Sequence, residues 1–369
     1  MDNENTHIGI IGAGTIGETI YKMLIAMGYK FRVSVADVKE RDVLIKEDNY
    51  YQISSSSPVK NFIENKTLII NAAPFHQNIE IYKHCYLKSV PYFDLSEDDE
   101  LDKYIDELCI QAPISKNNIP FTMPHCGLAP GMSTVIANHL VKKLVEPKDV
   151  KIRVGALSQN ATNKLKYFTS WSGDGLVNEY LGDCQVVRDG NFEFVQALTG
   201  YEKLTLNEIE YEAFNTSGGL GTFAKTLSEK YSDINVNYKT LRRIGHHDYT
   251  DFLFNDLKLS QEQLTDIFKK CIPKTVHDMV IIYVAVEGME KNNLNNIRRY
   301  MYYKVFRPGN VMGRYMTAIQ QTTASGCLTA VELFLNGKLP EKGYVKQEDI
   351  DLDQALSTYY GGLYREYEN

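Results

Sequence analysis

The chain has 369 residues, 43% of them apolar, so it is long enough for two domains with sizeable cores. Its formal net charge of −7 gives no electrostatic reason to expect nucleic acid or an anionic membrane as a partner. The first seven residues are polar and no apolar run approaches the roughly 18 residues that span a bilayer, so we expect neither a signal peptide nor a membrane span.

A glycine-rich turn stands near the start of the chain. An apolar strand is predicted at residues 8–11 and a helix at residues 18–27, with Gly12-Ala13-Gly14-Thr15-Ile16-Gly17 between them. In this setting the first glycine permits a tight turn, the second lets the backbone approach a pyrophosphate, and the third lets helix and strand pack closely. A purely structural turn is the alternative. The residues expected to bind a dinucleotide are Gly12, Gly14, Thr15 and Ile16.

A second predicted strand, Val33–Asp37, ends in a carboxylate about twenty residues after the turn. An acidic residue at this position binds the ribose hydroxyls of a dinucleotide, and its charge repels a 2′-phosphate. We therefore expect Asp37 to contact the ribose, and NAD to be favoured over NADP.

Strands and helices continue to alternate, which predicts right-handed βαβ units and a doubly wound α/β sheet. The strands are predicted at residues 67–71, 91–95 and 119–123, and the helices at residues 78–87 and 101–111. Ligands of such sheets bind beyond the carboxyl ends of the strands. We expect Ala72, Ala73 and Pro74 to lie near the nicotinamide ribose, although an ordinary turn is the alternative.

Other side chains near the strand ends could act on a substrate. Asp94 could pair with a substrate amine, or it could merely cap the helix that begins near Glu100. His125 and Cys126 follow the strand at residues 119–123. A histidine can transfer a proton near neutral pH, but a lone histidine is more often structural, and Cys126 has no obvious base beside it.

The pattern changes after Gly127-Leu128-Ala129-Pro130-Gly131, a loop that leads into a predicted helix at residues 132–144. The strands beyond it are separated by few helices, which predicts a largely antiparallel sheet and an α+β second domain. We place the domains at residues 1–130, 131–315 and 316–369, and expect the last to return to the first. The strands are predicted at residues 150–157, 185–188, 192–196, 234–241, 279–287 and 300–306, and the helices at residues 261–271, after a Ser260/Gln263 capping box, and 317–335.

Three polar stretches of the second domain could bind a substrate. Residues 166–172 hold the only tryptophan, Trp171, and residues 212–222 are rich in hydroxyl groups and glycine, which suits a ligand with carboxylates. Residues 238–247 end a strand with Arg242 and Arg243, either of which could bind a carboxylate through two nitrogens. A flexible loop and a charged edge strand are the alternatives.

The cysteines and histidines give no metal pattern. Six cysteines without a Cys-x-x-Cys pair favour reduced thiols and a cytoplasmic protein. His246, His247 and Asp248 are adjacent, but no second ligand pair stands at metal-binding spacing, so we expect no metal.

The chain resembles the saccharopine dehydrogenase family, which includes lysine 6-dehydrogenase and saccharopine reductase. The resemblance covers nearly the whole chain and rests on the glycine turn and on a specific series of later motifs. These motifs are Asn71-Ala72-Ala73-Pro74, Tyr92-Phe93-Asp94-Leu95, Gly127-Leu128-Ala129-Pro130-Gly131, Trp171-Ser172, Glu212-Ala213-Phe214-Asn215-Thr216-Ser217-Gly218-Gly219 and Lys239-Thr240-Leu241-Arg242.

The resemblance implies a Rossmann domain completed by a C-terminal helical segment, and an inserted α+β domain for substrate and dimer contacts. It therefore implies a homodimer. It also implies that a hydride passes from the carbon bearing the ε-nitrogen to the nicotinamide, after which water attacks the imine. In the family, saccharopine gives allysine and glutamate, and lysine gives allysine and ammonia.

One departure concerns the substrate. Fungal saccharopine reductases carry an arginine shortly after the Trp-Ser pair, where this chain has Asp174, and Pro-Asn-Arg-Asp in place of Asn215-Thr216-Ser217-Gly218. Their recognition of the glutamate arm therefore does not transfer, and the loop resembles lysine 6-dehydrogenase more closely.

We predict an NAD-dependent oxidoreductase that acts on the CH–NH bond of a lysine-derived amine, with saccharopine as the first candidate and lysine as the second. Asp94 would anchor the amine and His246 would transfer a proton. A non-catalytic NAD-sensing protein and a polyamine enzyme are the alternatives, but the cations near Arg242 argue against polyamines. The other residues expected to bind the amino-acid substrate are Cys126, Trp171, Asn215, Thr216, Ser217 and Arg242.

Overall fold

The computed structural model describes residues 6–27, 31–40, 45–97, 99–111, 114–290 and 293–366. The chain forms two compact units: the first combines its beginning, up to Met132, with Thr322–Arg365, and the second contains Ser133–Gln321 and the chain from Glu366. Residues 1–5, most of the polar start that argued against a signal peptide, lie outside the described residues. Within the described ranges, no helix combines the length and apolar character that crossing a bilayer requires.

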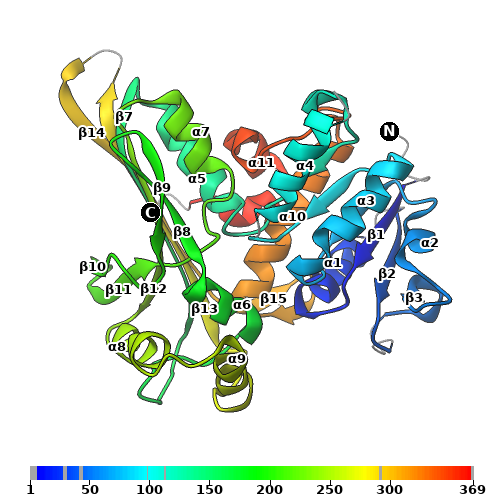
Figure 1. Cartoon of the computed structure of the whole chain (residues 1–369), viewed down its shortest axis with the longest axis horizontal. Coiled ribbons are helices and arrows are strands. Elements are labelled where there is room, and N and C mark those ends of the chain that lie inside the picture. The colour runs from blue at the N-terminus through cyan, green and yellow to red at the C-terminus, as the bar shows by residue number, and fades with distance from the viewer. Residues whose placement is uncertain are drawn as a thin grey trace. The chain divides into compact units, whose positions relative to one another are not determined.

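The described part of the first unit is built on a six-stranded sheet with the order β3-β2-β1-β4-β5-β6, coloured blue to cyan in Figure 1. Every neighbouring pair is parallel, and the order reverses direction between β1 and β4. The predicted doubly wound sheet is therefore confirmed. Its strands are β1 (His7–Ile11), β2 (Arg32–Asp37), β3 (Tyr50–Gln52), β4 (Leu68–Asn71), β5 (Tyr92–Asp94) and β6 (Thr122–Met123).

The central strands of this sheet are apolar along their length because helices and the rest of the unit cover them. Ile8, Ile10, Ile69, Ile70 and Phe93 are completely buried, as expected for parallel strands covered on both faces. The helices of this unit are α1 (Thr15–Ala26), α2 (Val59–Ile63), α3 (Asn78–Lys88), α4 (Glu100–Gln111), most of α10 (Ala318–Leu335) and α11 (Leu352–Ser357).

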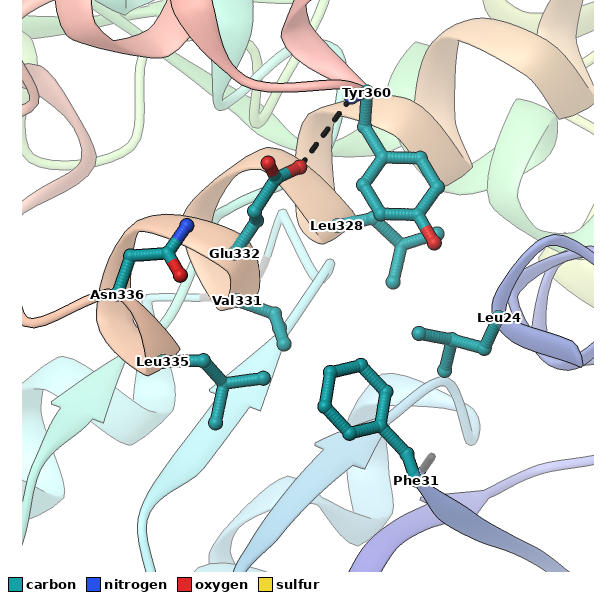
Figure 2. Close-up of a pocket in the computed structure, with 8 residues that line it drawn as sticks. All are labelled: Leu24, Phe31, Leu328, Val331, Glu332, Leu335, Asn336 and Tyr360. Carbon is teal, nitrogen blue, oxygen red and sulfur yellow. Dashed lines mark hydrogen bonds between the residues drawn. The ribbon is translucent and has the colours of Figure 1, made fainter. Parts of the chain in front are cut away.

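Helix α10 packs near α1 around a small pocket, shown in Figure 2. The pocket is lined mainly by apolar side chains, so it offers few partners to a charged ligand. Beside it, the carboxylate of Glu332 accepts hydrogen bonds from the backbone N–H groups of Tyr359, at 3.1 Å, and Tyr360, at 3.5 Å. This carboxylate ties the chain after α10 to the helix. The lining residues are Leu24, Phe31, Leu328, Val331, Glu332, Leu335, Asn336 and Tyr360.

The described part of the second unit contains an eight-stranded sheet. Its main path runs β10-β11-β12-β7-β13-β14, with β8 paired to β12 and β9 paired to β8. Only the β12–β7 pair is parallel, so the predicted, largely antiparallel sheet is confirmed. The strands are β7 (Glu146–Ser158), β8 (Asp183–Arg188), β9 (Asn191–Gln196), β10 (Glu202–Leu206), β11 (Ile209–Asn215), β12 (Asn235–Arg243), β13 (Asp278–Glu290) and β14 (Asn293–Phe306), followed by the hairpin β15 (Gly309–Val311) and β16 (Arg314–Met316).

Within the described residues, the second unit also contains five α-helices. The predicted capping box is present at the start of α9, where Ser260 and Gln263 bond each other's backbone N–H groups. Strand β11 corrects the expectation of a loop over residues 212–222, because it includes Glu212 to Asn215. The helices are α5 (Met132–Lys142), α6 (Gly173–Leu181), α7 (Phe223–Lys230), α8 (His246–Asp251) and α9 (Gln261–Lys270).

Candidate functional site

The glycine turn connects β1 to α1, and two of its glycines are required by close packing. Gly12 has a φ of +102°, and a Cβ on it would lie 2.6 Å from the backbone of Ala72. A Cβ on Gly17 would lie 1.9 Å from the carbonyl oxygen of Gly12. Gly14 differs from both, because a Cβ there would meet no atom within 4 Å. The space beside Gly14 is therefore open to a ligand.

The first turn of α1 suits an anion. Gly14 is the N-cap of this 12-residue helix, and no side chain caps it. Gly14 and Thr15 are exposed and Ile16 is half-buried. The N–H groups of a first helical turn have no partner within the helix, and the helix dipole adds partial positive charge there. These features fit the pyrophosphate of a dinucleotide.

Asp37 lies at the end of β2, beside the glycine turn. Its carboxylate accepts hydrogen bonds from the backbone N–H of Ala13, at 2.6 Å, and of Lys39, at 2.9 Å. Because Asp37 is only half-buried, its carboxylate can also accept bonds from a ribose beside the turn. The same negative charge would repel a 2′-phosphate.

The loops after β1, β4 and β5 share one edge of the sheet. In the parallel register Ile11 stands opposite Asn71, and Asn71 stands opposite Asp94. The backbone N–H of Ala72 also donates to the carbonyl of Ile11 at 2.7 Å. The segment Ala72–Pro74 is half-buried to exposed, and it lies where the strand order changes direction, the usual place for a ligand.

A chain of polar side chains links this segment to Asp94. The amide of Asn71 accepts from the N–H of Ala73 at 3.1 Å and donates to Asn78 at 2.8 Å. Asn78 donates to the hydroxyl of Ser96 at 2.8 Å, and this hydroxyl donates to Asp94 at 3.0 Å. The loops after β4 and β5 are thus held in a fixed relation.

Asp94 is completely buried, yet one of its oxygens is unused. Its Oδ1 accepts from the N–H and hydroxyl of Ser96, both at 3.0 Å, and from the N–H of His125 at 3.2 Å. Its Oδ2 has no hydrogen-bond partner within bonding distance among the described residues, although the hydroxyl of Tyr92 interacts with the same carboxyl. Burial raises the pKa of Asp94, and the charge of His125 opposes this rise. A buried carboxylate oxygen without a partner is costly unless a ligand supplies a donor.

Cys126 packs behind this carboxylate. Its N–H and its thiol both donate to the backbone carbonyl of Asp94, at 2.9 Å. Its Sγ lies 3.8 Å from the Sγ of Cys327 in α10. Burial and these neighbours raise the pKa of Cys126 well above its usual value, so the thiol keeps its proton. This environment favours a packing role that fixes the end of β5.

No partner of His125 is evident from the sequence, whereas the structure shows several. Its Nδ1 lies 2.8 Å from the carbonyl oxygen of Ser96, and its Nε2 lies 2.8 Å from Oδ2 of Asp102 in α4. Asp99, Asp102 and His125 bring potential metal ligands within 4.8 Å of one another. Because Nε2 bonds directly to Asp102, we interpret the group as an ion pair. Tyr344 donates to the other oxygen of Asp102 at 2.5 Å.

In the second unit, Arg242 is the centre of a buried polar cluster. Its Nε donates to the hydroxyl of Tyr180 at 2.7 Å, and one terminal nitrogen donates to the carbonyl of Leu241 at 3.0 Å. The other terminal nitrogen lies 3.6 Å from Oε2 of Glu179. The guanidinium also lies over the ring of Tyr167, 5.2 Å from its centroid. Burial raises the pKa of Glu179 to about 7, despite the opposing charge of Arg242.

His246 joins the same cluster from α8. Its Nδ1 lies 2.8 Å from the carbonyl oxygen of Leu165, and its Nε2 lies 2.9 Å from the hydroxyl of Tyr180. A carbonyl only accepts, so Nδ1 carries the proton and Nε2 accepts from Tyr180. Burial and the charge of Arg242 lower the pKa of His246 to about 3. The geometry thus favours a neutral histidine that orients Tyr180 over the proton transfer expected from the sequence.

The remaining predicted substrate residues bond neighbouring elements. Trp171 donates from its indole N–H to the hydroxyl of Tyr167 at 3.1 Å, so it joins the Arg242 cluster. The side chains at the end of β11 and directly after it form hydrogen bonds outside this cluster and tie the strand to its surroundings. Asn215 donates to Thr199 and Thr216 donates to Thr240, both at 3.1 Å, and Ser217 donates to the carbonyl of Asn178 in α6 at 3.2 Å.

Comparison with known proteins covers almost the whole chain. The family model for the saccharopine dehydrogenase NADP-binding domain matches residues 8–116, and that for the saccharopine dehydrogenase C-terminal domain matches residues 127–366. Apo saccharopine dehydrogenase (L-Glu forming) from Saccharomyces cerevisiae has a similar fold, with a TM-score of 0.73 and 14% identity over 96% of this chain and 98% of that one. Homospermidine synthase from Legionella pneumophila, solved with NAD, gives a TM-score of 0.66 and 12% identity over 97% and 89%.

Proposed function

Because this chain belongs to the saccharopine dehydrogenase family, we propose that it is an NAD-dependent oxidoreductase acting on the CH–NH bond of a lysine-derived amine. Saccharopine is the first candidate substrate, which would give allysine and glutamate, and lysine is the second. The oxidoreductase class follows from the family. The proposal adds the substrate that donates the hydride and the choice of NAD as the cofactor.

The observation that carries this proposal is the unused oxygen of Asp94. It belongs to a fully buried carboxylate at the carboxyl end of β5, and the register places it level with the end of β4. The site of a nicotinamide ring is expected at this edge of the sheet. A cationic amine would supply the missing donor and an opposite charge, whereas the hydroxyl of an alcohol substrate would supply only a donor.

The residues of the first unit would hold the cofactor, which supplies hydride acceptance when it is bound. Gly12, Gly14, Thr15 and Ile16 would bind the pyrophosphate at the start of α1, and Ala72, Ala73 and Pro74 would lie along the nicotinamide ribose. Asp94 would then hold the amine nitrogen and orient the adjacent C–H bond. Positioning of this kind supplies much of the rate in hydride transfer enzymes.

Asp37 supports NAD as the cofactor, although the matching family model is named for NADP. Its carboxylate bonds the glycine turn through Ala13, so the negative charge is fixed beside the expected ribose. A 2′-phosphate there would be repelled by that charge.

Arg242 is the proposed partner of a substrate carboxylate in the second unit. Among the described residues, one of its terminal nitrogens has a polar contact only with Glu179, at 3.6 Å, so it retains capacity for a stronger bond. Trp171 and His246 would act through Tyr167 and Tyr180, which hold the guanidinium in place. We retain Asn215, Thr216 and Ser217 as proposed substrate contacts of the second unit, and Cys126 as one of the first unit.

The test is an absorbance assay for reduced nicotinamide with saccharopine, lysine, opines that carry a glutamate arm, and polyamines, each with NAD and NADP. We expect turnover with saccharopine and NAD. Turnover with lysine alone would assign the enzyme as a lysine 6-dehydrogenase. Binding of NAD without turnover of any amine would refute the proposal and favour an NAD-sensing protein.

Two variants separate the roles within the site. Asp94→Asn should abolish most turnover while NAD still binds, and Glu100→Gln, an exposed carboxylate on α4, is its control. Gly14→Ala should weaken NAD binding with little change in stability, because the new Cβ enters only the open space beside the turn. Full turnover by Asp94→Asn would contradict the assignment of the amine anchor.

A further inference from the structure

His125 carries a hydrogen-bond pattern that a neutral imidazole cannot satisfy. Both ring nitrogens face acceptors: the carbonyl oxygen of Ser96 and the carboxylate of Asp102, each at 2.8 Å. A backbone carbonyl has no proton to give, and a carboxylate has none while it is ionised. A neutral ring carries only one N–H, so the pair of contacts requires the doubly protonated imidazolium.

The surroundings of the ring stabilise this positive charge. The ring is completely buried, and Asp94, Asp99 and Asp102 are the carboxylates that act on it. Burial alone would lower the pKa of His125, but these charges and the bond to Asp102 outweigh burial and raise the pKa to about 10.

Asp102 is itself held in the ionised form. Burial would raise its pKa, but the charge of His125, the bond from Tyr344 and the charge of Lys116 lower it. In the alternative arrangement, a protonated Asp102 would donate to a neutral ring of His125. The contacts that keep Asp102 ionised disfavour this arrangement.

The charge of His125 bears directly on Asp94. Its backbone N–H bonds Oδ1 of Asp94, and its ring charge opposes the effect of burial on the pKa of that carboxyl. The other titratable neighbours of Asp94 include Tyr92, Cys126 and Tyr344, and burial raises the pKa of all three, so they are uncharged at neutral pH. They therefore supply no positive charge to balance the carboxylate.

We propose that His125 is a positioning residue: a fixed, buried imidazolium that keeps Asp94 ionised and leaves its second oxygen free for a cationic amine. The proposal deepens the proposed function and rests on it for the identity of the ligand. Asparagine is the replacement that best keeps the backbone conformation at this position. His125 has a φ of +61°, which asparagine also tolerates. His125→Asn therefore removes the charge with little added backbone strain.

The first experiment needs no substrate. Ring nitrogen NMR of the full chain labelled with ¹⁵N-histidine would report the protonation of each ring, with His125→Asn used to assign the signal. We expect His125 to keep both ring protons at about pH 8, well above the usual pKa of histidine near 6.5. A neutral ring at that pH, or one that titrates with its usual pKa, would overturn the proposal.

The second experiment measures kcat/KM for the amine against pH. Loss of an adjacent opposite charge raises a carboxyl pKa by about 1–3 units, so the acid limb of the His125→Asn profile should move up by that amount. The KM for NAD should stay unchanged. His84→Asn, which removes a partly exposed imidazole from α3, is the control. An unmoved acid limb in folded His125→Asn would contradict the proposal.

The two experiments separate this inference from the proposed function. If the wild-type protein oxidises no amine, the proposed function fails, whereas the ring protonation still decides whether His125 is an imidazolium. If the wild type oxidises an amine but His125 is neutral, only the inference fails. If His125→Asn does not fold, the NMR titration of the wild type remains decisive, with assignment through Asp102→Asn instead.

Discussion

The free energy of unfolding should depend on pH through His125. The folded-state pKa is raised from 6.5 to about 10, so the folded chain keeps a proton that the unfolded chain loses. The resulting stabilisation is fully present below the unfolded pKa and is lost as the pH rises through the folded pKa. From about pH 7.5 to about pH 9.5 the loss from this one group is about 2–3 kcal/mol, because one pH unit changes the free energy by about 1.4 kcal/mol over most of the window.

Urea unfolding followed by far-UV circular dichroism would measure this loss in the wild type and in His125→Asn. Tyrosines and cysteines also titrate in this range, but their effects are common to both proteins and cancel in the comparison. We expect His125→Asn to be less stable than the wild type at about pH 7.5, and the difference in unfolding free energy to be smaller by about 2–3 kcal/mol at about pH 9.5. A gap that is the same at both pH values would refute the reasoning.

Three further predictions concern other contacts. Asp37→Ser should lower the ratio of the KM for NADP to the KM for NAD by about tenfold or more, because it removes the charge that repels a 2′-phosphate. An unchanged ratio would contradict the NAD assignment. Arg242→Lys should raise the KM for the amine by about tenfold or more, because lysine cannot bind a carboxylate through two nitrogens. The KM for NAD, also measured by initial rates, should not change. Asp278→Ala should lower the free energy of urea unfolding by about 2 kcal/mol, because the carboxylate caps α10 by bonds from Ala318 and Ile319; a change below about 0.5 kcal/mol would mean that the cap contributes little.

The sequence predicts the strand–turn–helix unit around the glycine turn because its signals are local. The turn at Gly12, the start of α1 and the carboxylate of Asp37 lie within about thirty residues, and each has a spacing that its chemistry requires. The partners of His125 have no such local signal. Asp102 lies 23 residues before it, and Tyr344 lies 242 residues after Asp102, so the fold alone brings them together.

Strand β11 was missed for a different reason. Its segment Glu212–Asn215 carries buried polar side chains, which a pattern based on hydrophobicity assigns to a loop. Glu212 is buried because it accepts hydrogen bonds from the N–H groups of Gly245 and His247 at the start of α8. These partners come from a separate element, so the sequence alone could not show that the carboxylate would be satisfied inside the unit.

The polar network of the first unit explains why a carboxylate is retained at the end of β5 despite burial. An isolated buried carboxylate would take up a proton, because desolvation disfavours its charged form. Asp94 instead receives three hydrogen bonds on one oxygen and faces the charge of His125, which is itself balanced by Asp102. The same network extends through Ser96 and Asn78 toward the segment Ala72–Pro74. One connected set of side chains thus fixes both the charge of Asp94 and its position relative to the expected nicotinamide site. The proposed hydride transfer from an amine requires both, because the charge holds the nitrogen and the position orients the adjacent C–H bond.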